Sequence, residues 1–336
     1  MKIVLTASLF VLSAVVSLAQ DSLPPLREGK VPQNLTEFWG EYDPRREPVA
    51  AEVTREWEQD GIVCRVLRYH VGVFKGAPAK VAAFYAFPKG AAKLPGLLHL
   101  HGGGQSASFD SVLTDAKKGY ASMSLNWGGN VMRMGKDGVY EGPNTDWGKV
   151  DATHPPQRNK VNHFAGGIAP DEFTLDPVES PRNSSWMLVV VAARRALTFL
   201  EQQPEVDPDR LGLYGHSMGG RSLELGSVSE NPYIEQISVP TLWLSPTNDF
   251  HAHMDNMAYT WRNVPEGLLR LSMSPHFNHR HSSEHAITQH LWFETHLKGA
   301  LQLPATPQLA LNLKTQDGVP ELVVRPDSSR PVKAVH

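Results

Sequence analysis

One pentapeptide constrains the fold of this chain more than any other feature. Gly215-His216-Ser217-Met218-Gly219 has the pattern G-x-S-x-G, with a small residue two positions before and two positions after the serine. The apolar run at 210–214 predicts a strand before it, and the residues after Gly219 predict a helix. In that context the serine lies on a strained turn and its Oγ projects above a sheet. The motif therefore predicts a nucleophile at Ser217.

The segments around this pentapeptide alternate between strand-like and helical patterns. Apolar residues recur at helical spacing over 184–203, and shorter helices are expected near 113–117, 218–228 and 286–297. Strands are expected at 62–69, 81–87, 96–101, 120–125, 210–214, 240–244 and 268–273. This alternation predicts an α/β fold with a mostly parallel sheet covered by helices on both faces. Short turns between the strand-like runs of 49–88 predict that the sheet opens with antiparallel strands.

A glycine run follows the strand expected at 96–101. His101-Gly102-Gly103-Gly104-Gln105 lies upstream of the serine, at the chain position of the oxyanion loop of serine esterases. Glycine lets the backbone approach a substrate closely and direct N–H groups at a developing negative charge. The backbone N–H of Met218 is the expected first donor, and that of Gly103 or Gly104 the second.

The acid of such a site follows the serine in the chain and precedes the histidine. Asp249 lies just past the strand expected at 240–244, so it is the predicted acid. Asp255 is the alternative, although it is expected to lie a turn into a helix.

The base is expected to follow the strand at 268–273. His276, His279 and His281 all lie there, and spacing alone does not choose among them. Acyl transfer requires that one of them accepts the Ser217 proton while a carboxylate orients it.

Histidines gather in this region, which raises a metal site as an alternative. The possible ligands are His251, His253, His276, His279, His281 and His285, three of which would suffice for zinc. A histidine cluster beside a complete serine motif more often supplies one base together with substrate and packing contacts. No metal and no other cofactor is therefore expected.

Composition excludes several other classes of protein. The net charge is −3 and no block of Lys or Arg is present, so the sequence does not predict nucleic-acid binding. The single cysteine, Cys64, rules out an internal disulfide and any multi-cysteine metal site. A small ester or an acylated carbohydrate is the partner that the family resemblance described below implies.

The first 20 residues have the layout of a secretory signal peptide. Lys2 supplies positive charge, an apolar run extends from Ile3 to Val16, and Ser17-Leu18-Ala19 is a small-x-small cleavage pattern. The run is shorter than the ~20 apolar residues that span a membrane. We therefore expect cleavage, no membrane span afterwards, and a secreted or periplasmic bacterial protein.

The mature chain is expected to have three parts. An irregular lead-in at 21–48 precedes an α/β domain at 49–300, and a proline-containing extension at 301–336 looks like the start of a truncated β-rich accessory piece. Inside the domain, residues 128–183 are too long and polar for a simple connection. Together with Trp127 they are candidates for a sugar-binding rim, because aromatic faces suit sugar rings; the alternative for Trp127 is the core.

Five short segments resemble secreted bacterial α/β-hydrolases of the acetyl xylan esterase and dienelactone hydrolase-like group. In the sequence they are HLHGGGQ, NWGG, GHSMGG, SPTNDF and SPHFNHRH. The resemblance covers about residues 80–300 and implies an α/β-hydrolase fold. It also implies a serine carboxylic-ester hydrolase that deacylates, and most simply deacetylates, a carbohydrate through a Ser-His-Asp triad and an acyl-enzyme.

The resemblance also selects the base. Related sequences carry it in a P-N-M-x-H-G-like stretch after the last strand, which aligns with Pro275-His276-Phe277-Asn278-His279-Arg280. The alignment implies His279 as the base, with His276 at the family's asparagine and Arg280 in place of its glycine.

The chain departs from the family between the nucleophile and the acid. Only residues 218–248 separate Ser217 from Asp249, where relatives fit two helices and two strands. One strand is therefore expected to be missing, so that the strand at 240–244 would lie directly beside the nucleophile's strand. This shortening keeps open a non-catalytic binding protein on a hydrolase scaffold. A serine peptidase of the prolyl oligopeptidase type shares the fold, but its propeller domain does not fit in residues 20–90.

Overall fold

The computed structural model of the chain describes residues 20–26, 30–134, 141–158, 168–220, 233–329 and 331–332. Residues 1–19, which make up most of the expected signal peptide, lie outside these residues. So do residues 221–228 of the helix expected at 218–228. Within them, no helix combines the length and the apolar character needed to cross a membrane.

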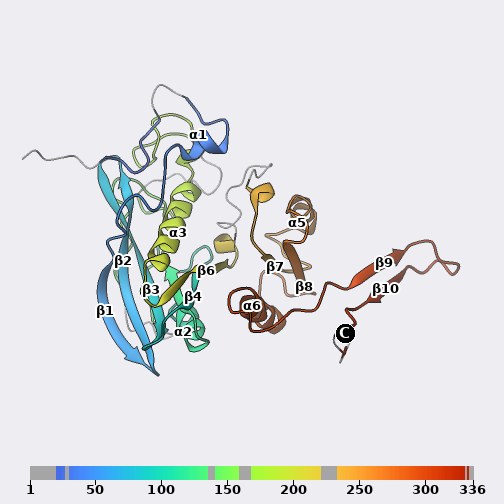
Figure 1. Ribbon diagram of the computed structural model, residues 1–336. Helices are drawn as coiled ribbons and strands as arrows, with labels where there is room; N and C mark the ends of the chain where they lie inside the picture. The colour runs from blue at the N-terminus through green and yellow to red at the C-terminus, as the bar shows by residue number, and fades with distance from the viewer. Residues whose placement is uncertain are drawn as a thin grey trace, which may run out of the picture.

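The largest sheet of the described chain has six strands in the order β1-β2-β3-β5-β4-β6 (Figure 1). Its strands are β1 (Glu52–Gln59), β2 (Ile62–Phe74), β3 (Ala77–Pro88), β4 (Leu94–Leu100), β5 (Ala121–Leu125) and β6 (Val206–Gly215). β1, β2, β3 and β5 pair antiparallel in that order, whereas β4 pairs parallel with both β5 and β6. The predicted α/β class, with an antiparallel N-terminal part and parallel strands at the serine, is confirmed.

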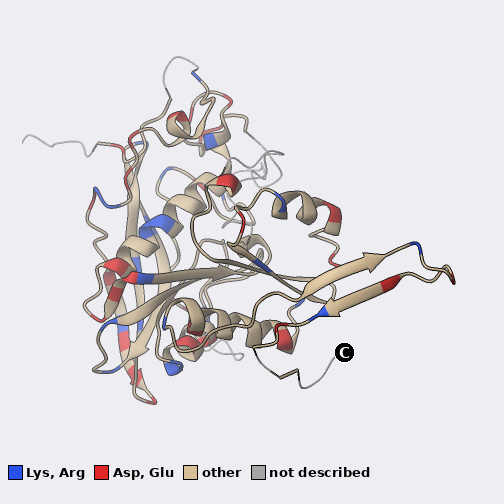
Figure 2. Cartoon of the chain, turned by 45° about the vertical axis from the view of Figure 1, so that its right-hand side comes forward, with Lys and Arg blue, Asp and Glu red and all other residues tan. Residues whose placement is uncertain are grey.

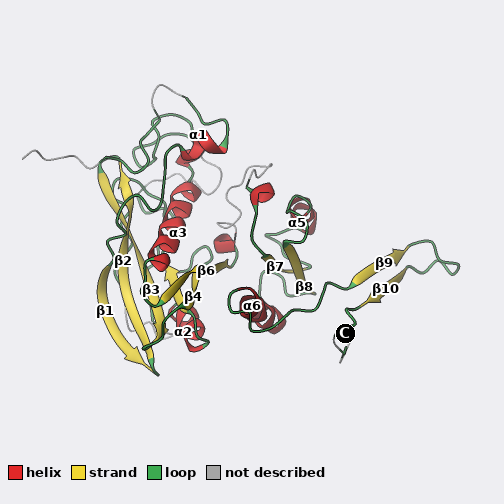
Figure 3. Cartoon of the chain, in the orientation of Figure 1, coloured by secondary structure: helices red, strands yellow, loops and turns green. Residues whose placement is uncertain are grey.

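Helices cover both faces of this large sheet. α3 (Ser185–Glu201) lies along one face and α2 (Phe109–Lys117) along the other (Figure 3). Successive strand residues point to opposite faces, so Leu67 of β2 packs in the cluster under α3 while Val66 packs in the cluster under α2. Each such side chain contributes on the order of 2 kcal/mol when it is fully buried.

A second, smaller unit carries the next part of the chain. It comprises β7 (Thr241–Pro246), α5 (Met254–Trp261), β8 (Leu269–Ser274) and α6 (Ser283–His296), and we call it the β7–β8 unit. β7 and β8 pair in parallel with each other but form a sheet separate from β6 (Figure 1). The prediction that the strand before Asp249 lies directly beside the nucleophile's strand is therefore wrong.

Side chains of α6 join this unit to the large sheet in place of a strand ladder. Trp292 and Phe293 form a buried cluster with Leu97 of β4 and with Tyr120, which directly precedes β5. Large apolar side chains thus fill the contact where the two sheets are not hydrogen-bonded, which gives the physical reason that the unit stays attached without a shared ladder.

Polar contacts of Glu294 reinforce this junction. Tyr120 Oη donates a hydrogen bond of 2.7 Å to Glu294 Oε1, and Lys298 Nζ lies 2.8 Å from the same oxygen. Lys298 Nζ also lies 4.0 Å from the centroid of the Tyr120 ring and donates to the carbonyl of Lys118. The junction therefore combines apolar packing with a small charged network.

The described part of the lead-in contains a short helix, α1 (Leu35–Trp39), and is fastened to α3. Arg195 of α3 is 2% exposed, and its guanidinium donates to the backbone carbonyls of Pro44, Glu47 and Pro48. Backbone oxygens thus satisfy a buried charge without a carboxylate partner.

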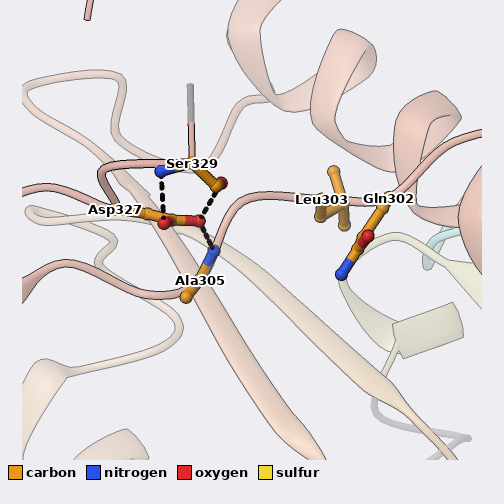
Figure 4. Close-up of a pocket in the computed structure, with 5 residues that line it drawn as sticks. All are labelled: Gln302, Leu303, Ala305, Asp327 and Ser329. Carbon is orange, nitrogen blue, oxygen red and sulfur yellow. Dashed lines mark hydrogen bonds between the residues drawn. The ribbon is translucent and has the colours of Figure 1, made fainter. Parts of the chain in front are cut away.

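The C-terminal hairpin of β9 (Gln308–Asn312) and β10 (Glu321–Arg325) projects from the rest of the chain (Figure 1). Asp327 closes its base, because its carboxylate accepts hydrogen bonds from Ala305 N at 2.8 Å, Ser329 N at 2.9 Å and Ser329 Oγ at 2.7 Å (Figure 4). Basic and acidic residues are interspersed along the described chain, which matches its small net charge of −3 (Figure 2).

Candidate active site

Ser217 lies on a tight turn at the end of β6. Its φ is +56°, a left-handed conformation that is costly for a residue other than glycine. The flanking glycines make the turn possible: a Cβ on Gly219 would lie 2.1 Å from Leu100 O, and one on Gly215 would lie 2.5 Å from Gly219 C. The spacing of the G-x-S-x-G motif is therefore required by close approach of the backbone to itself.

The structure brings together the three residues that the sequence proposed as a triad. His279 Nε2 lies 2.6 Å from Ser217 Oγ, and His279 Nδ1 lies 2.9 and 2.8 Å from the two carboxylate oxygens of Asp249. Ser217 follows β6, Asp249 follows β7 and His279 follows β8. A nucleophile, a base within reach of it and a carboxylate that orients the base are the parts that acyl transfer requires.

Asp249 lies in a setting that keeps its carboxyl charged. Burial alone raises the pKa of a carboxyl, and Asp249 is 9% exposed. Hydrogen bonds from His279 and from the backbone N–H groups of His251, at 2.7 Å, and Ala252, at 3.2 Å, outweigh burial and lower the pKa of Asp249. The charged carboxylate favours the tautomer in which Nδ1 of His279 carries a proton and Nε2 faces the serine.

Neighbouring asparagines hold the acid loop and the base loop together. Asn278 N donates to Asn248 Oδ1 at 2.9 Å. Asn278 directly precedes the base, His279, and Asn248 directly precedes the acid, Asp249. Asn278 and His276 both have left-handed backbone conformations, with φ of +52° and +61°, so the chain turns sharply before His279. His276 is exposed and forms no hydrogen bond with any described residue, and it does not occupy the base position.

The alternative acid is also placed by the structure. Asp255 lies in the first turn of α5, where the sequence predicted it. Asp249, and not Asp255, contacts the base.

The predicted oxyanion loop lies against the serine turn. A Cβ on Gly103 would lie 2.1 Å from Sδ of Met218, so the two residues with the predicted donor groups are immediate neighbours. Gln105 shapes the loop, because its Oε1 accepts the Gly102 N–H at 3.0 Å. The N–H groups of Gly103 and Gly104 are hydrogen-bonded to no described residue, which leaves them for a ligand.

Trp127 does not form a rim for a substrate. It is 0% exposed, and its ring stacks on His101 with centroids 4.6 Å apart and an interplanar angle of 2°. Its Nε1 donates to the His101 carbonyl at 3.2 Å, and burial lowers the pKa of His101 to about 4. The prediction of a sugar-binding Trp127 is therefore wrong, because the indole lies in the core and supports the start of the oxyanion loop from behind.

Other side chains surround the reacting groups, and the sequence did not single them out for this role. The rings of Phe250 and His251 lie 5.7 and 4.6 Å from that of His279, and Phe250 is 56% exposed. The long segment at 128–183 reaches the site through His154, whose Cδ2 lies 3.5 Å from the position of a Cβ on Gly103. The only sign in the sequence that Phe250 lies at the site is that it follows Asp249, and nothing in the sequence indicates that His154 lies there.

The clustered histidines do not converge on a common point. His281 packs against His216, with ring centroids 4.6 Å apart, and His285 is buried with its Nε2 3.0 Å from Ser274 Oγ. In the part of the chain that the structure describes, no three His, Cys, Asp or Glu side chains are grouped so that they could hold a metal ion.

The strand–serine–helix turn, the glycine loop before it and the order of acid and base define the class: the fold is that of an α/β-hydrolase. The family model for acetyl xylan esterase (AXE1) matches residues 17–248. The chain therefore belongs to the acetyl xylan esterase family and is a carboxylic ester hydrolase, as the sequence resemblance predicted. The match includes Ser217 and ends directly before Asp249.

Solved structures share this fold at low sequence identity. An acetyl xylan esterase from Paenibacillus sp. R4 is similar with 16% identity and a TM-score of 0.56, over 82% of this chain and 98% of the other. Acetyl xylan esterase 1 from Thermoanaerobacterium sp. JW/SL YS485 is similar with 16% identity and a TM-score of 0.57, over 79% and 94%. Comparison with curated protein sequences gives no match. Family membership thus supports a carbohydrate esterase, and the structures support the fold.

Proposed function

We propose that this chain is a secreted serine esterase that removes acyl groups, most simply acetate, from a carbohydrate. The observation that carries the proposal is the 2.6 Å contact between His279 Nε2 and Ser217 Oγ, with Asp249 on the other side of the imidazole. The triad geometry favours this function over a non-catalytic scaffold, because a binding protein needs no nucleophile in contact with a base. Secretion is proposed from the N-terminal segment, which has a signal-peptide layout.

The proposed reaction has two halves. Ser217 Oγ attacks the ester carbonyl while His279 takes its proton, and the new oxyanion accepts hydrogen bonds from the N–H groups of Met218 and of Gly103 or Gly104. Collapse breaks the ester bond, and His279 returns the proton to the departing sugar hydroxyl. Water then attacks the acyl-enzyme with His279 again as base, which releases the acid and restores the serine.

Replacement of the nucleophile tests this proposal. Ser217→Ala is expected to lower kcat for p-nitrophenyl acetate by on the order of 10⁴-fold or more, because the covalent route is lost. A fluorophosphonate probe is expected to label the unaltered protein and not the variant. Ser238→Ala, which changes an exposed serine that makes no hydrogen bond with any described residue, serves as the matched control.

Retention of more than a tenth of the activity by Ser217→Ala would contradict the proposal.

The acyl group that the enzyme prefers is then identified by measuring hydrolysis of acetylated xylan and of p-nitrophenyl esters with longer acyl chains. A deacetylase is expected to hydrolyse acetyl esters faster than esters of longer acyl groups.

A further inference from the structure

A hollow lies apart from the triad, between the lead-in and α3. Its volume is about 410 Å³, and it is bounded by α1, α3 and the short 3-10 helix η3 (Ile234–Gln236). The lining residues are Leu35, Thr36, Trp39, Tyr42, Arg194, Tyr233 and Gln236. None of these elements carries a triad residue. The hollow is thus a separate feature with three aromatic side chains and one cationic side chain.

Arg194 provides the charge of this hollow. Its guanidinium lies 4.4 Å from the centroid of the Trp39 ring and 5.2 Å from that of Tyr42. Backbone carbonyls satisfy the guanidinium of its neighbour Arg195, but the Arg194 guanidinium makes neither a hydrogen bond nor an ion pair with any described residue. A half-buried guanidinium that is held in place by aromatic rings and has no carboxylate partner is prepared to bind one, because its planar fork matches the two oxygens.

The aromatic residues around Arg194 are fixed in position. Trp39 Nε1 donates to Tyr233 Oη at 2.7 Å, and the rings of Trp39 and Tyr42 stack with centroids 5.7 Å apart. Tyr42 is 9% exposed, and its hydroxyl has no hydrogen-bond partner among the described residues. Rigid rings with polar tips present apolar faces and hydrogen-bonding groups together, and that combination fits the C–H face and the hydroxyls of a sugar.

One carboxylate of the lead-in that acts electrostatically on Tyr42, that of Glu47, is already engaged. Glu47 accepts a hydrogen bond from Ser22 Oγ at 2.5 Å and lies 2.9 Å from His70 Nε2. Glu47 thus has partners of its own, and no carboxylate of the described residues forms an ion pair with Arg194.

We infer that this hollow binds a uronic acid residue of an acidic polysaccharide. Arg194 pairs with the sugar carboxylate, and Trp39 and Tyr233 contact the ring. The volume of about 410 Å³ lies within the range of roughly 300–1,000 Å³ that is usual for small-ligand sites. The inference rests on the proposed function, which makes a carbohydrate polymer the substrate. The hollow would hold an acidic unit of the polymer while an acyl group elsewhere on it reaches Ser217.

Polymer binding by a catalytically silent protein tests the inference. In the Ser217→Ala background, native affinity electrophoresis is run with deacetylated glucuronoxylan and with a neutral arabinoxylan. We expect retardation by the acidic polymer and much weaker retardation by the neutral one. Arg194→Gln in the same background is expected to weaken binding of glucuronoxylan by about tenfold and to leave the neutral polymer unaffected, since a charge-assisted hydrogen bond is lost. Arg262→Gln, at an exposed arginine outside the hollow, is the matched control.

Activity measurements separate this inference from the proposed function. With Ser217 intact, Arg194→Gln is expected to keep its kcat for p-nitrophenyl acetate and to raise KM for acetylated glucuronoxylan. Equal binding of both polymers, no binding of either, or equal affinities of Arg194→Gln and its parent would overturn the inference. Absence of esterase activity in the unaltered protein would instead contradict the proposed function, while the polymer-binding result of the Ser217→Ala protein would stand independently.

Discussion

The large sheet and the β7–β8 unit hold their parts of the site in different ways. β6 pairs with β4 in a parallel ladder that ends at Leu100 and Gly215, so main-chain hydrogen bonds tie the serine turn to the oxyanion loop. Asp249 and His279 lie on the other unit, whose two strands bond only to each other. Side chains of α6 connect the two units.

This difference shows that two kinds of force set the geometry of one site. Ladder hydrogen bonds are directional and fix Ser217 against Gly103, whereas packing at α6 fixes Ser217 against His279. Packed side chains tolerate small shifts more easily than a ladder does. The distance between nucleophile and base is therefore the more sensitive part of the proposed triad.

Removal of the base is expected to have the largest effect. His279→Ala should lower kcat for p-nitrophenyl acetate nearly as far as Ser217→Ala does, by on the order of 10⁴-fold, because triad members act as a unit. His276→Ala is the matched control on the same loop and should lower kcat by about tenfold or less. A larger loss for His276→Ala than for His279→Ala would reverse the assignment of the base.

Neutralising the acid is expected to lower kcat less than removing the base does. Asp249→Asn keeps the shape of the side chain but removes the charge that orients His279, so kcat should fall by several hundred-fold or more. Steady-state kinetics measure this, with Asp255→Asn as the control on α5. Activity within tenfold of the unaltered protein would show that the β7–β8 unit does not supply the acid.

Weakening the junction should separate the two units dynamically. Glu294→Gln removes the charge that Tyr120 and Lys298 share, at a cost of roughly 1 kcal/mol. Hydrogen–deuterium exchange followed by mass spectrometry should show amides of β7 and β8 exchanging about fivefold faster, with those of β2 and β3 unchanged. Glu321→Gln on the exposed hairpin is the control. Equal acceleration in both regions would mean that the two units open together.

Chelation is expected to have the smallest effect. The described histidines are not grouped for a metal, so dialysis against EDTA should change activity by less than about twofold. Loss of activity that added zinc restores would instead assign the histidines of the β7–β8 unit to a metal site.

Local patterns in the sequence predicted most of the fold. The helix expected at 184–203 is α3 at Ser185–Glu201, and the strand expected at 268–273 is β8 at Leu269–Ser274, because apolar periodicity reports directly on a buried face. The bounds of α5 were not predicted, although a helix was expected at Asp255, since polar residues interrupt its apolar positions. The separation of β7 from β6 was also not predicted, because strand pairing depends on contacts between distant segments that spacing does not encode.

In the candidate site, too, the features set by local sequence were predicted and those set by contacts between distant segments were not. Ser217 was found from five consecutive residues, because the turn geometry is local. His279 was chosen over His276 only through the family resemblance, and its contact with Ser217 depends on how two sheets meet. Trp127 was misplaced because burial depends on what packs around a side chain, and an indole in a polar stretch of sequence gives no sign of the His101 ring stacked on it.

The left-handed backbone of Ser217 has an evolutionary consequence. A residue with φ of +56° costs the folded chain of order 1–3 kcal/mol, and glycine at the same position would relieve much of that cost. Mutational drift toward a more stable turn therefore leads directly to loss of the hydroxyl. A lineage therefore keeps the serine only while selection for the chemistry opposes selection for stability.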